Sequence, residues 1–242
     1  AASDVYKRQL ENLFDTINDT SKRDEASPIM EMKYNRSEVY NKKIKNLSKV
    51  ISGIGFEETK TLPTIVGLCE VENKNVVEDL INSDLLKNAN YGISHFDSPD
   101  ERGIDVALIY RKNMFKILNE NSAYLELKYA SGKINYTRDQ LVVEGVLENE
   151  KIYIIVNHWP SRSGGELGSR PYRNKAAELN MFIIDSIQSI NKNAKIITMG
   201  DFNDDPTNES IKKILGAKDS RNNLKNSDLD NPWENLFKSG VG

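Results

Sequence analysis

The sequence predicts an α/β protein built as one domain. Short aliphatic runs alternate with segments whose apolar residues repeat at helical spacing, a pattern typical of helices that cover the faces of a sheet. The chain has 242 residues, enough to bury a sizeable core, and contains neither an internal repeat nor a Ser/Pro-rich linker. Its hydrophobic fraction of 38% excludes wholesale disorder, and no apolar run approaches the length of a membrane-spanning helix.

The spacing of apolar residues predicts four helices. The first runs from Ser37, which can cap it, to about Gly53, and the second covers roughly 74–87. A long helix has Pro171 near its start, where proline is tolerated, and a short helix begins near Thr207. The predicted buried stripe of the long helix consists of Ala176, Leu179, Ile183, Ile187 and Ile190.

Aliphatic runs predict the strands. Residues 64–71 form a buried strand, 104–110 a second, and 195–199 the last clear one. The runs 141–147 and 152–156 flank a short polar turn and read as a paired hairpin. These strands alternate with the predicted helices along the chain, so we expect helices to cover the faces of the sheet.

Charge and cysteine content exclude several classes of protein. Lys and Arg number 33 against 36 Asp and Glu, which gives a net charge of −3 and no broad basic face for nucleic acid. An anionic substrate must therefore be bound locally, by a metal or a few arginines. Cys69 is the only cysteine, which excludes an internal disulfide framework. His95 and His158 are the only histidines, which argues against a multi-histidine zinc site.

Unusual polar residues follow three of the predicted strands. Glu70 ends the first strand, 157–162 reads Asn-His-Trp-Pro-Ser-Arg, and 200–205 reads Gly-Asp-Phe-Asn-Asp-Asp. Strand ends are where α/β proteins assemble their sites. Carboxylate oxygens suit Mg²⁺, a histidine and an aspartate can handle protons, and the arginines between 162 and 173 suit phosphate oxygens.

Each of these residues also has a structural interpretation. Glu70 alone is more often a salt-bridged strand end, and His158 alone is more often a hydrogen-bonded structural histidine. The segment 200–205 alone could be a turn stabilised by its own side chains, and the arginines could form a solvated loop. His95 matches no motif and is interpreted as structural or substrate-adjacent.

In combination and in order, these motifs resemble the endonuclease/exonuclease/phosphatase family, which has the deoxyribonuclease-I-like fold. The resemblance covers roughly residues 10 to 240 and is nearest to a bacterial subgroup with the long Asn-His-Trp-Pro-Ser-Arg motif. The motifs that carry it are 11–15, 67–73, 97–107, 137–139, 157–162 and 200–205.

The resemblance implies a four-layer α/β/β/α sandwich: two stacked mixed sheets flanked by helices, with the site at one edge. It also implies hydrolysis of phosphate esters with Mg²⁺ or Mn²⁺. The expected partner is a phosphodiester, with nucleic acid among the candidates. No protein partner is indicated, and we expect a monomer without a transmembrane segment.

Matching motifs also imply roles for individual residues. Glu70 matches the family's metal ligand, and His158 the histidine that contacts the phosphate and stabilises its developing charge. Asp201 matches the residue that orients or activates the attacking water, and Asn203 its partner in holding phosphate and nucleophile. The predicted substrate-binding residues are Arg138, Asn157 and Arg162.

Two departures from the family pattern concern the chain ends. Gln9 stands where the family's first strand ends in a metal-site Asn, and no Asp-His pair, whose His is the family's general base, occurs in the sequence. We therefore expect residues 1–9 to be foreign to the native protein. We expect 10–242 to be a single domain that is incomplete at its C-terminus and lacks its closing strand or strands.

Three functions remain open at this point. The first is a metal-dependent, nuclease-like phosphodiesterase. The second is a phosphatase or phosphodiesterase acting on a small or lipid phosphoester, which the acidic pI of about 5.6 slightly favours. The third is a catalytically inactive binding domain of the same fold, which the missing base and the missing Asn support.

Overall fold

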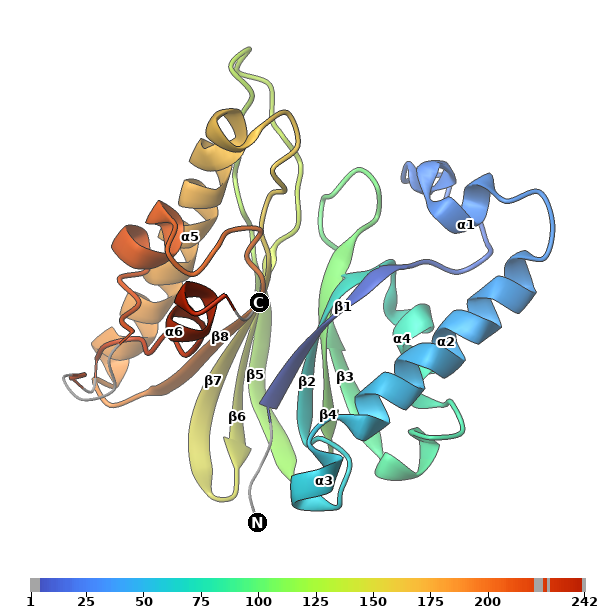
Figure 1. Ribbon diagram of the computed structural model, residues 1–242, viewed down its shortest axis with the longest axis horizontal. Helices are drawn as coiled ribbons and strands as arrows, with labels where there is room; N and C mark the ends of the chain where they lie inside the picture. The colour runs from blue at the N-terminus through green and yellow to red at the C-terminus, as the bar shows by residue number, and fades with distance from the viewer. Residues whose placement is uncertain (1–4, 220–223, 226, 241–242) are drawn as a thin grey trace.

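Two four-stranded sheets lie face to face in the computed structural model, which describes residues 5–219, 224–225 and 227–240 (Figure 1). The first sheet has the order β1-β2-β4-β3 and the second the order β5-β6-β7-β8. The pairs β1–β2 and β7–β8 are parallel and the others antiparallel, so both sheets are mixed. The strands are β1 Val5–Leu13, β2 Ile65–Val71, β3 Tyr91–His95, β4 Asp105–Arg111, β5 Phe115–Ala123, β6 Gln140–Leu147, β7 Glu150–His158 and β8 Lys195–Asp201.

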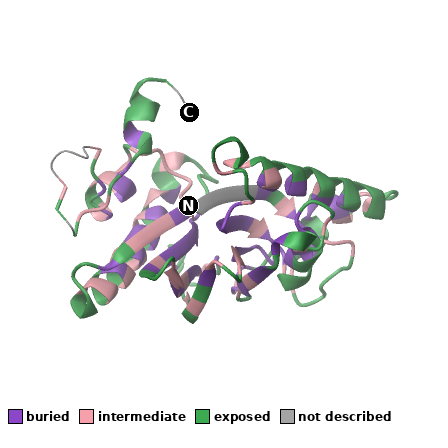
Figure 2. Cartoon of the chain, turned by 90° about the horizontal axis from the view of Figure 1, so that it is seen from below, coloured by how far each residue is buried: buried purple, intermediate pink, exposed green. Residues whose placement is uncertain are grey.

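Helices cover the outer face of each sheet, which completes the predicted four layers and confirms the fold class (Figures 1 and 2). The first sheet carries α1 Pro28–Glu31, α2 Arg36–Gly53, α3 Phe56–Thr59 and α4 Lys74–Ile81, with short 3₁₀ turns η1 Asp24–Ala26 and η2 Lys87–Ala89. The second carries α5 Glu166–Ile190, the π-helical turn η3 Ser210–Ile214 and α6 Trp233–Lys238. Within the described residues, no helix is long and apolar enough to cross a membrane.

Strand β2 shows how the layers are held together. Its alternate residues Val66 and Leu68 belong to the core beneath α2 and α4, whereas Ile65 and Cys69 belong to the core between the sheets. Both faces of the strand are therefore buried, which explains its continuous apolar run. A Cβ atom on Gly67 would lie 3.1 Å from Met199 of the other sheet, so glycine here permits the sheets to approach closely.

The buried face of α5 differs from the predicted stripe. Of that stripe only Ala176 is buried, and Ile190 is 88% exposed. The buried positions include Arg173 and Asn180, which make hydrogen bonds within the protein. Leu179 and Ile183 of the stripe are partly buried against the same core, so the prediction was correct in part. The buried face also includes polar side chains, which the apolar pattern does not report.

Other sequence predictions differ in their boundaries. Helix α2 is preceded by Asn35 in the left-handed conformation, so Ser37 is not its cap, and α4 ends at Ile81 rather than near 87. The helix expected from Thr207 is the shorter turn η3. Strands β1, β3 and β5 and helix α6 were not predicted. Because β1 pairs with β2 from Val5 onward, part of the segment 1–9 belongs to the sheet; its foreign origin stays a prediction.

Candidate functional site

Glu70, His158 and Asp201 converge where the C-terminal ends of β2, β7 and β8 meet. One possible ligand atom from each lies within 4.8 Å of the others. Glu70 Oε1 lies 4.0 Å from His158 Nε2, and these two side chains are 14% and 6% exposed. Three residues that come from distant parts of the sequence thus share one corner between the sheets, as the motif order predicts.

Glu70 is presented by strained backbone. The register between β2 and β4 shifts at this residue, and its φ of 65° lies in the left-handed region. The neighbouring strand β1 has a matching irregularity, where Glu11 and Asn12 have φ values of 54° and 59°. The backbone N–H of Asn12 donates a hydrogen bond of 2.8 Å to Glu70 Oε2. Adjacent bulges therefore turn the carboxylate toward the corner and hold it there.

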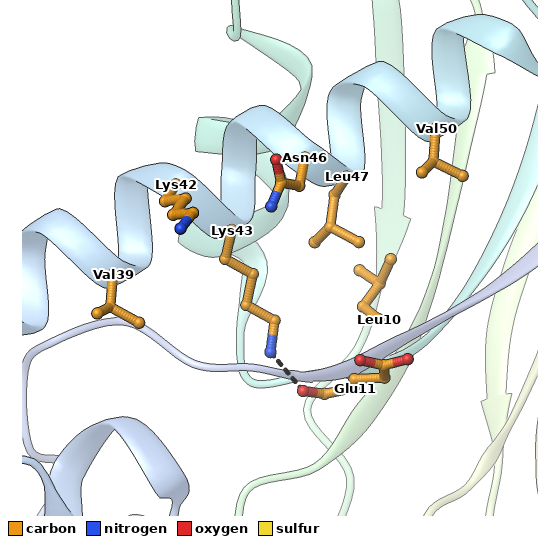
Figure 3. Close-up of a pocket in the computed structure, with 8 residues that line it drawn as sticks. All are labelled: Leu10, Glu11, Val39, Lys42, Lys43, Asn46, Leu47 and Val50. Atoms are coloured by element: carbon orange, nitrogen blue, oxygen red, sulfur yellow. Dashed lines mark hydrogen bonds between the residues drawn. The ribbon is translucent and has the colours of Figure 1, made fainter.

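Lys43 of α2 holds the bulge of β1 in place. Its ammonium group donates to the carbonyl of Glu11, the bond drawn in Figure 3, and to that of Asn12 at 2.9 Å. Burial lowers the pKa of Lys43, against the opposing effect of Glu11 and Glu70. Lys43 also lines a groove of about 380 Å³ between β1 and α2. Sequence reasoning missed Lys43 because nothing in the spacing of α2 distinguishes it from exposed lysines.

His158 and Asp201 lie side by side because β7 and β8 are parallel and in register. Their Cα atoms are partners in the ladder, and the N–H of Trp159 donates to the carbonyl of Asp201 at 2.8 Å. Gly200 has a φ of 134°, and a Cβ atom there would lie 2.0 Å from the carbonyl oxygen of Asn157. Only glycine at position 200 allows β7 and β8 to approach this closely, one residue before His158 and Asp201.

Asn203 is fixed beside Asp201 by two hydrogen bonds. Its backbone N–H donates to Asp201 Oδ1 at 3.0 Å, and its side-chain Nδ2 donates to the carbonyl of Trp159 at 2.8 Å. Its φ of 51° adds a fourth left-handed residue to Glu11, Asn12 and Glu70. The predicted catalytic residue is thus near the corner, in a conformation that asparagine tolerates better than most residues.

Arg138 is buried and binds protein groups. Its guanidinium lies 3.1 Å from Asp100 and donates to the carbonyls of His158 and Trp159, at 3.2 and 2.7 Å. Burial alone would raise the pKa of Asp100, but Arg138 and Arg102 outweigh it and hold that pKa below its ordinary value. These contacts fix the backbone that follows β7. The predicted role of Arg138 in binding substrate stays a prediction.

Asn157 lies fully inside the protein. Its Nδ2 donates to Thr198 Oγ1 and to the carbonyl of Met199, and its Oδ1 accepts from Asn180 of α5 at 2.8 Å and from Trp159 Nε1. This network joins β7, β8 and α5. The geometry indicates a structural position for Asn157, and its predicted contact with substrate remains without support.

Arg162, in the loop after β7, and Arg173, inside α5, differ in their exposure and partners. Arg162, with a side chain 39% exposed, donates to the carbonyl of Asn203 and to Asp205 Oδ2, each at 3.0 Å. Arg173 is fully buried and pairs with Asp204 at 2.6 Å. Only Arg162 of this pair is therefore placed to meet an anionic ligand, and Arg173 anchors the loop that carries Asn203.

The donors at the corner fit a divalent metal. Glu70 and Asp201 offer carboxylate oxygens, which Mg²⁺ and Mn²⁺ prefer, and His158 places an imidazole nitrogen beside them. A second group in the described residues, His95 with Asp97 and Asp105, also has ligand atoms within 4.8 Å of one another.

Two stacked mixed sheets with a polar site at their common edge define the class of protein with the deoxyribonuclease-I-like fold. The chain belongs to the endonuclease/exonuclease/phosphatase family, whose sequence model matches residues 5–242. No curated protein matches the chain.

Solved structures share this fold at low sequence identity. A family member from Bacteroides thetaiotaomicron superposes with a TM-score of 0.52 at 14% identity, over 76% of this chain and 63% of that one. A conserved protein from Enterococcus faecalis gives 0.51 at 17%, over 72% and 65%. TDP2 from Caenorhabditis elegans gives 0.51 at 18%, over 75% and 46%. The chain thus matches less than two thirds of the length of these structures, and the likeness shows the fold.

Proposed function

We propose that this protein is a Mg²⁺- or Mn²⁺-dependent hydrolase of phosphate esters, and most specifically a nuclease-like phosphodiesterase. The observation that carries the proposal is the convergence of Glu70, His158 and Asp201 within 4.8 Å at the edge of the two sheets. Membership of a family of endonucleases, exonucleases and phosphatases supports the reaction class.

Each residue has a role that its position supports. Glu70, fixed by the N–H of Asn12, would hold the metal, which supplies charge neutralisation to the phosphate oxygens when bound. His158 would donate a hydrogen bond to a non-bridging phosphate oxygen and stabilise the charge that grows there. Asp201 would accept a hydrogen bond from the attacking water. Asn203 would help to position both, and Arg162 would attract the phosphate from the rim.

The sequence also bears on the expected rate. His158 lies in the corner, and His95, the other histidine, is hydrogen bonded to Asp105 at 3.2 Å. No further histidine remains in the 242 residues to serve as general base. A general base contributes about 10²- to 10⁴-fold in rate, so we expect these residues alone to turn over slowly.

The test measures first metal binding and then hydrolysis. Calorimetric titration with Mn²⁺ compares the parent with Glu70→Gln, and the exposed Glu57→Gln of α3 serves as control. We expect Glu70→Gln to weaken binding by about tenfold or more, the range for a perturbed metal site, and Glu57→Gln to bind as the parent does.

Hydrolysis is then measured on bis-p-nitrophenyl phosphate, a single-stranded oligonucleotide and sphingomyelin, with Mn²⁺ and with EDTA. Metal-dependent cleavage of the oligonucleotide supports the nuclease-like activity, whereas cleavage of sphingomyelin alone favours the lipid phosphoester that the acidic net charge suggests. Equal Mn²⁺ binding by Glu70→Gln, or hydrolysis that EDTA leaves intact, would contradict the metal-dependent mechanism. Binding without any hydrolysis would favour a binding domain.

A further inference from the structure

A hairpin-like arm, residues 124–139, connects β5 to β6 and projects beyond the second sheet (Figure 1). Its two segments pair through an antiparallel bridge between Lys128 and Ile134. The N–H of Asn135 also donates to the carbonyl of Leu127 at 2.9 Å. The arm therefore extends the antiparallel pairing of β5 and β6 past the edge of the sheet.

The two faces of the arm differ in exposure. Side chains alternate between faces along each segment, and residues paired across the segments share a face. Leu125 and Leu127 are 4% and 2% exposed and belong to the core that includes Ala176 of α5. The opposite face is exposed and carries two aromatic rings, one aliphatic side chain and two charges, from Tyr124, Glu126, Lys128, Ile134 and Tyr136.

This exposed face continues the face of the second sheet that carries His158. Ser122 pairs with Leu141, which belongs to the core between the sheets, so Tyr124, two residues further on, lies on that side. Val156 belongs to the same core, so His158, two residues beyond it, also lies on that side. When the two ladders are extended by one residue, Tyr124 is level with His158, two strands away. Because neighbouring strands are about 4.8 Å apart, the two backbones are separated by about 10 Å.

The base of the arm is fixed to the strand end that carries His158. The guanidinium of Arg138 donates to the carbonyls of His158 and Trp159. Asp139 lies between the two segments at this level, and its carboxylate accepts from Ser122 Oγ at 2.9 Å and from the N–H of Leu125 at 3.4 Å. The exposed face of the arm therefore borders the Glu70 corner and is held in a defined position.

The side chains of this face suit nucleotides that are not base-paired. Tyr124 and Tyr136 are 47% and 44% exposed, and an exposed aromatic ring can stack on a nucleobase that is free of a duplex. Lys128 pairs with Glu126 at 2.8 Å, but an exposed ion pair of this kind is weak, so the ammonium group can bind a phosphate instead. Arg162 adds a second positive group at the rim.

A lipid surface fits this face less well. Insertion into a membrane requires a continuous apolar surface. On the arm, the charged Glu126 and Lys128 follow Tyr124 on one segment, opposite Ile134 and Tyr136 on the other. Aromatic rings interspersed with charges are instead typical of proteins that bind single-stranded nucleic acid.

We infer that the arm recognises single-stranded nucleic acid: bases next to the phosphodiester at the Glu70 corner stack on Tyr124 and Tyr136, and Lys128 contacts their phosphates. This recognition rests on the proposed function, because the strand is taken to run from that corner. It narrows the substrate to an unpaired polynucleotide and disfavours a small or lipid phosphoester.

The test measures binding of a fluorescein-labelled oligothymidylate of about 12 nucleotides to the whole chain by fluorescence anisotropy. EDTA is present, so that the oligonucleotide is not hydrolysed in a metal-dependent reaction. The variants are Tyr124→Ala, Tyr136→Ala, Tyr124→Phe and Tyr124→Leu, each checked by thermal unfolding. Phe182→Ala is the matched control, because Phe182 is an aromatic residue of α5 that is 69% exposed outside the arm.

We expect Tyr124→Ala and Tyr136→Ala each to raise the Kd by about tenfold, the effect of losing one stacked base. Tyr124→Phe and Phe182→Ala should bind as the parent does. Tyr124→Leu should bind as weakly as Tyr124→Ala, because leucine is apolar but has no aromatic face. A duplex of the same length should bind the parent more weakly than the single strand. If Tyr124→Ala does not fold, Tyr136→Ala and Tyr124→Leu decide the outcome by the same criteria.

Three results would overturn the inference. The first is that the parent does not bind the oligonucleotide, and the second is that the alanine variants bind it as tightly as the parent. The third is that the parent binds vesicles of phosphatidylcholine and sphingomyelin through Tyr124 and Tyr136 and does not bind the oligonucleotide. Because binding is measured in EDTA, it is independent of hydrolysis. Tyrosine-dependent binding without hydrolysis would contradict only the proposed function, and hydrolysis with equal binding by all variants would contradict only the role of the arm.

Discussion

The two halves of the candidate metal corner are built by opposite means. Glu70 comes from the first sheet, on a bulged strand with left-handed backbone, and accepts a hydrogen bond from the N–H of Asn12, whose carbonyl binds Lys43. His158 and Asp201 come from the second sheet, on regular parallel strands whose ends are fixed by buried polar groups. One half depends on strained backbone close to the surface and the other on an interior network.

Because of this difference, substitutions at the second sheet should affect folding, whereas substitutions at the first sheet should affect metal binding. At the second sheet, Arg138 and Asn157 are buried and make hydrogen bonds within the protein, so changes there should affect folding. On the first sheet, Lys43 supports only the bulge, so its loss should affect the position of Glu70 more than global stability. The following predictions test whether that separation holds.

The largest effect is expected from His158→Ala. Loss of a group that stabilises charge in the transition state reduces kcat by about 10²- to 10³-fold. Steady-state hydrolysis of bis-p-nitrophenyl phosphate with Mn²⁺, alongside urea unfolding, measures both consequences. A fall in unfolding free energy large enough to account for the lost activity would make His158 a structural residue.

Arg138→Met should have the largest effect on stability. Removing the buried partner leaves Asp100 with only the half-exposed Arg102, and it also removes the donor to the carbonyls of His158 and Trp159. We expect a cost toward the lower end of the about 3–5 kcal/mol in the free energy of unfolding that breaking a buried ion pair entails. Arg102→Met is the matched control, because Arg102 pairs with the same carboxylate but is 54% exposed, and it should cost no more than about 1 kcal/mol. If urea unfolding gave the same loss of stability for Arg138→Met and Arg102→Met, the distinction between a buried ion pair and an exposed one would be contradicted.

The same ion pair gives a pH dependence with a definite sign. Because the pKa of Asp100 is held below its ordinary value in the folded protein, the pair's contribution is present above about pH 4 and is lost as pH falls through the lower folded pKa. Unfolding free energies measured from pH 6 downward should therefore fall more steeply for the parent than for Asp100→Asn. A parallel pH dependence in the two proteins would exclude this contribution.

Lys43→Met should have the smallest effect, confined to the first sheet. Without the ammonium group, the carbonyls of Glu11 and Asn12 lose their donor, and the N–H that orients Glu70 is less well placed. We expect Mn²⁺ affinity to fall by about tenfold, the lower range for groups that orient a metal ligand. The exposed neighbour Lys42→Met is the control and should bind as the parent does. An unchanged Mn²⁺ affinity in Lys43→Met would show that the bulge of β1 keeps its conformation without Lys43.

The order of the motifs was enough to predict the class of fold and the meeting of Glu70, His158 and Asp201. Apolar runs specify strands, and the polar residues that follow them must lie at a strand end, so three such ends in one family pattern indicate one site. Cys69 and Gly67 likewise read as buried strand positions from their neighbours alone.

Only the tertiary structure decided what supports that site. The burial of Asn157 and Arg173, the clamp by Arg138 and the support from Lys43 depend on contacts between residues 20 or more positions apart, which local spacing does not encode. The stripe of α5 was only partly correct for the same reason, since its buried face also carries Arg173 and Asn180, which form hydrogen bonds with other elements. The spacing of apolar and polar residues indicates which face of a helix or strand is buried. The hydrogen-bond partners of buried polar groups are determined only when the layers pack together.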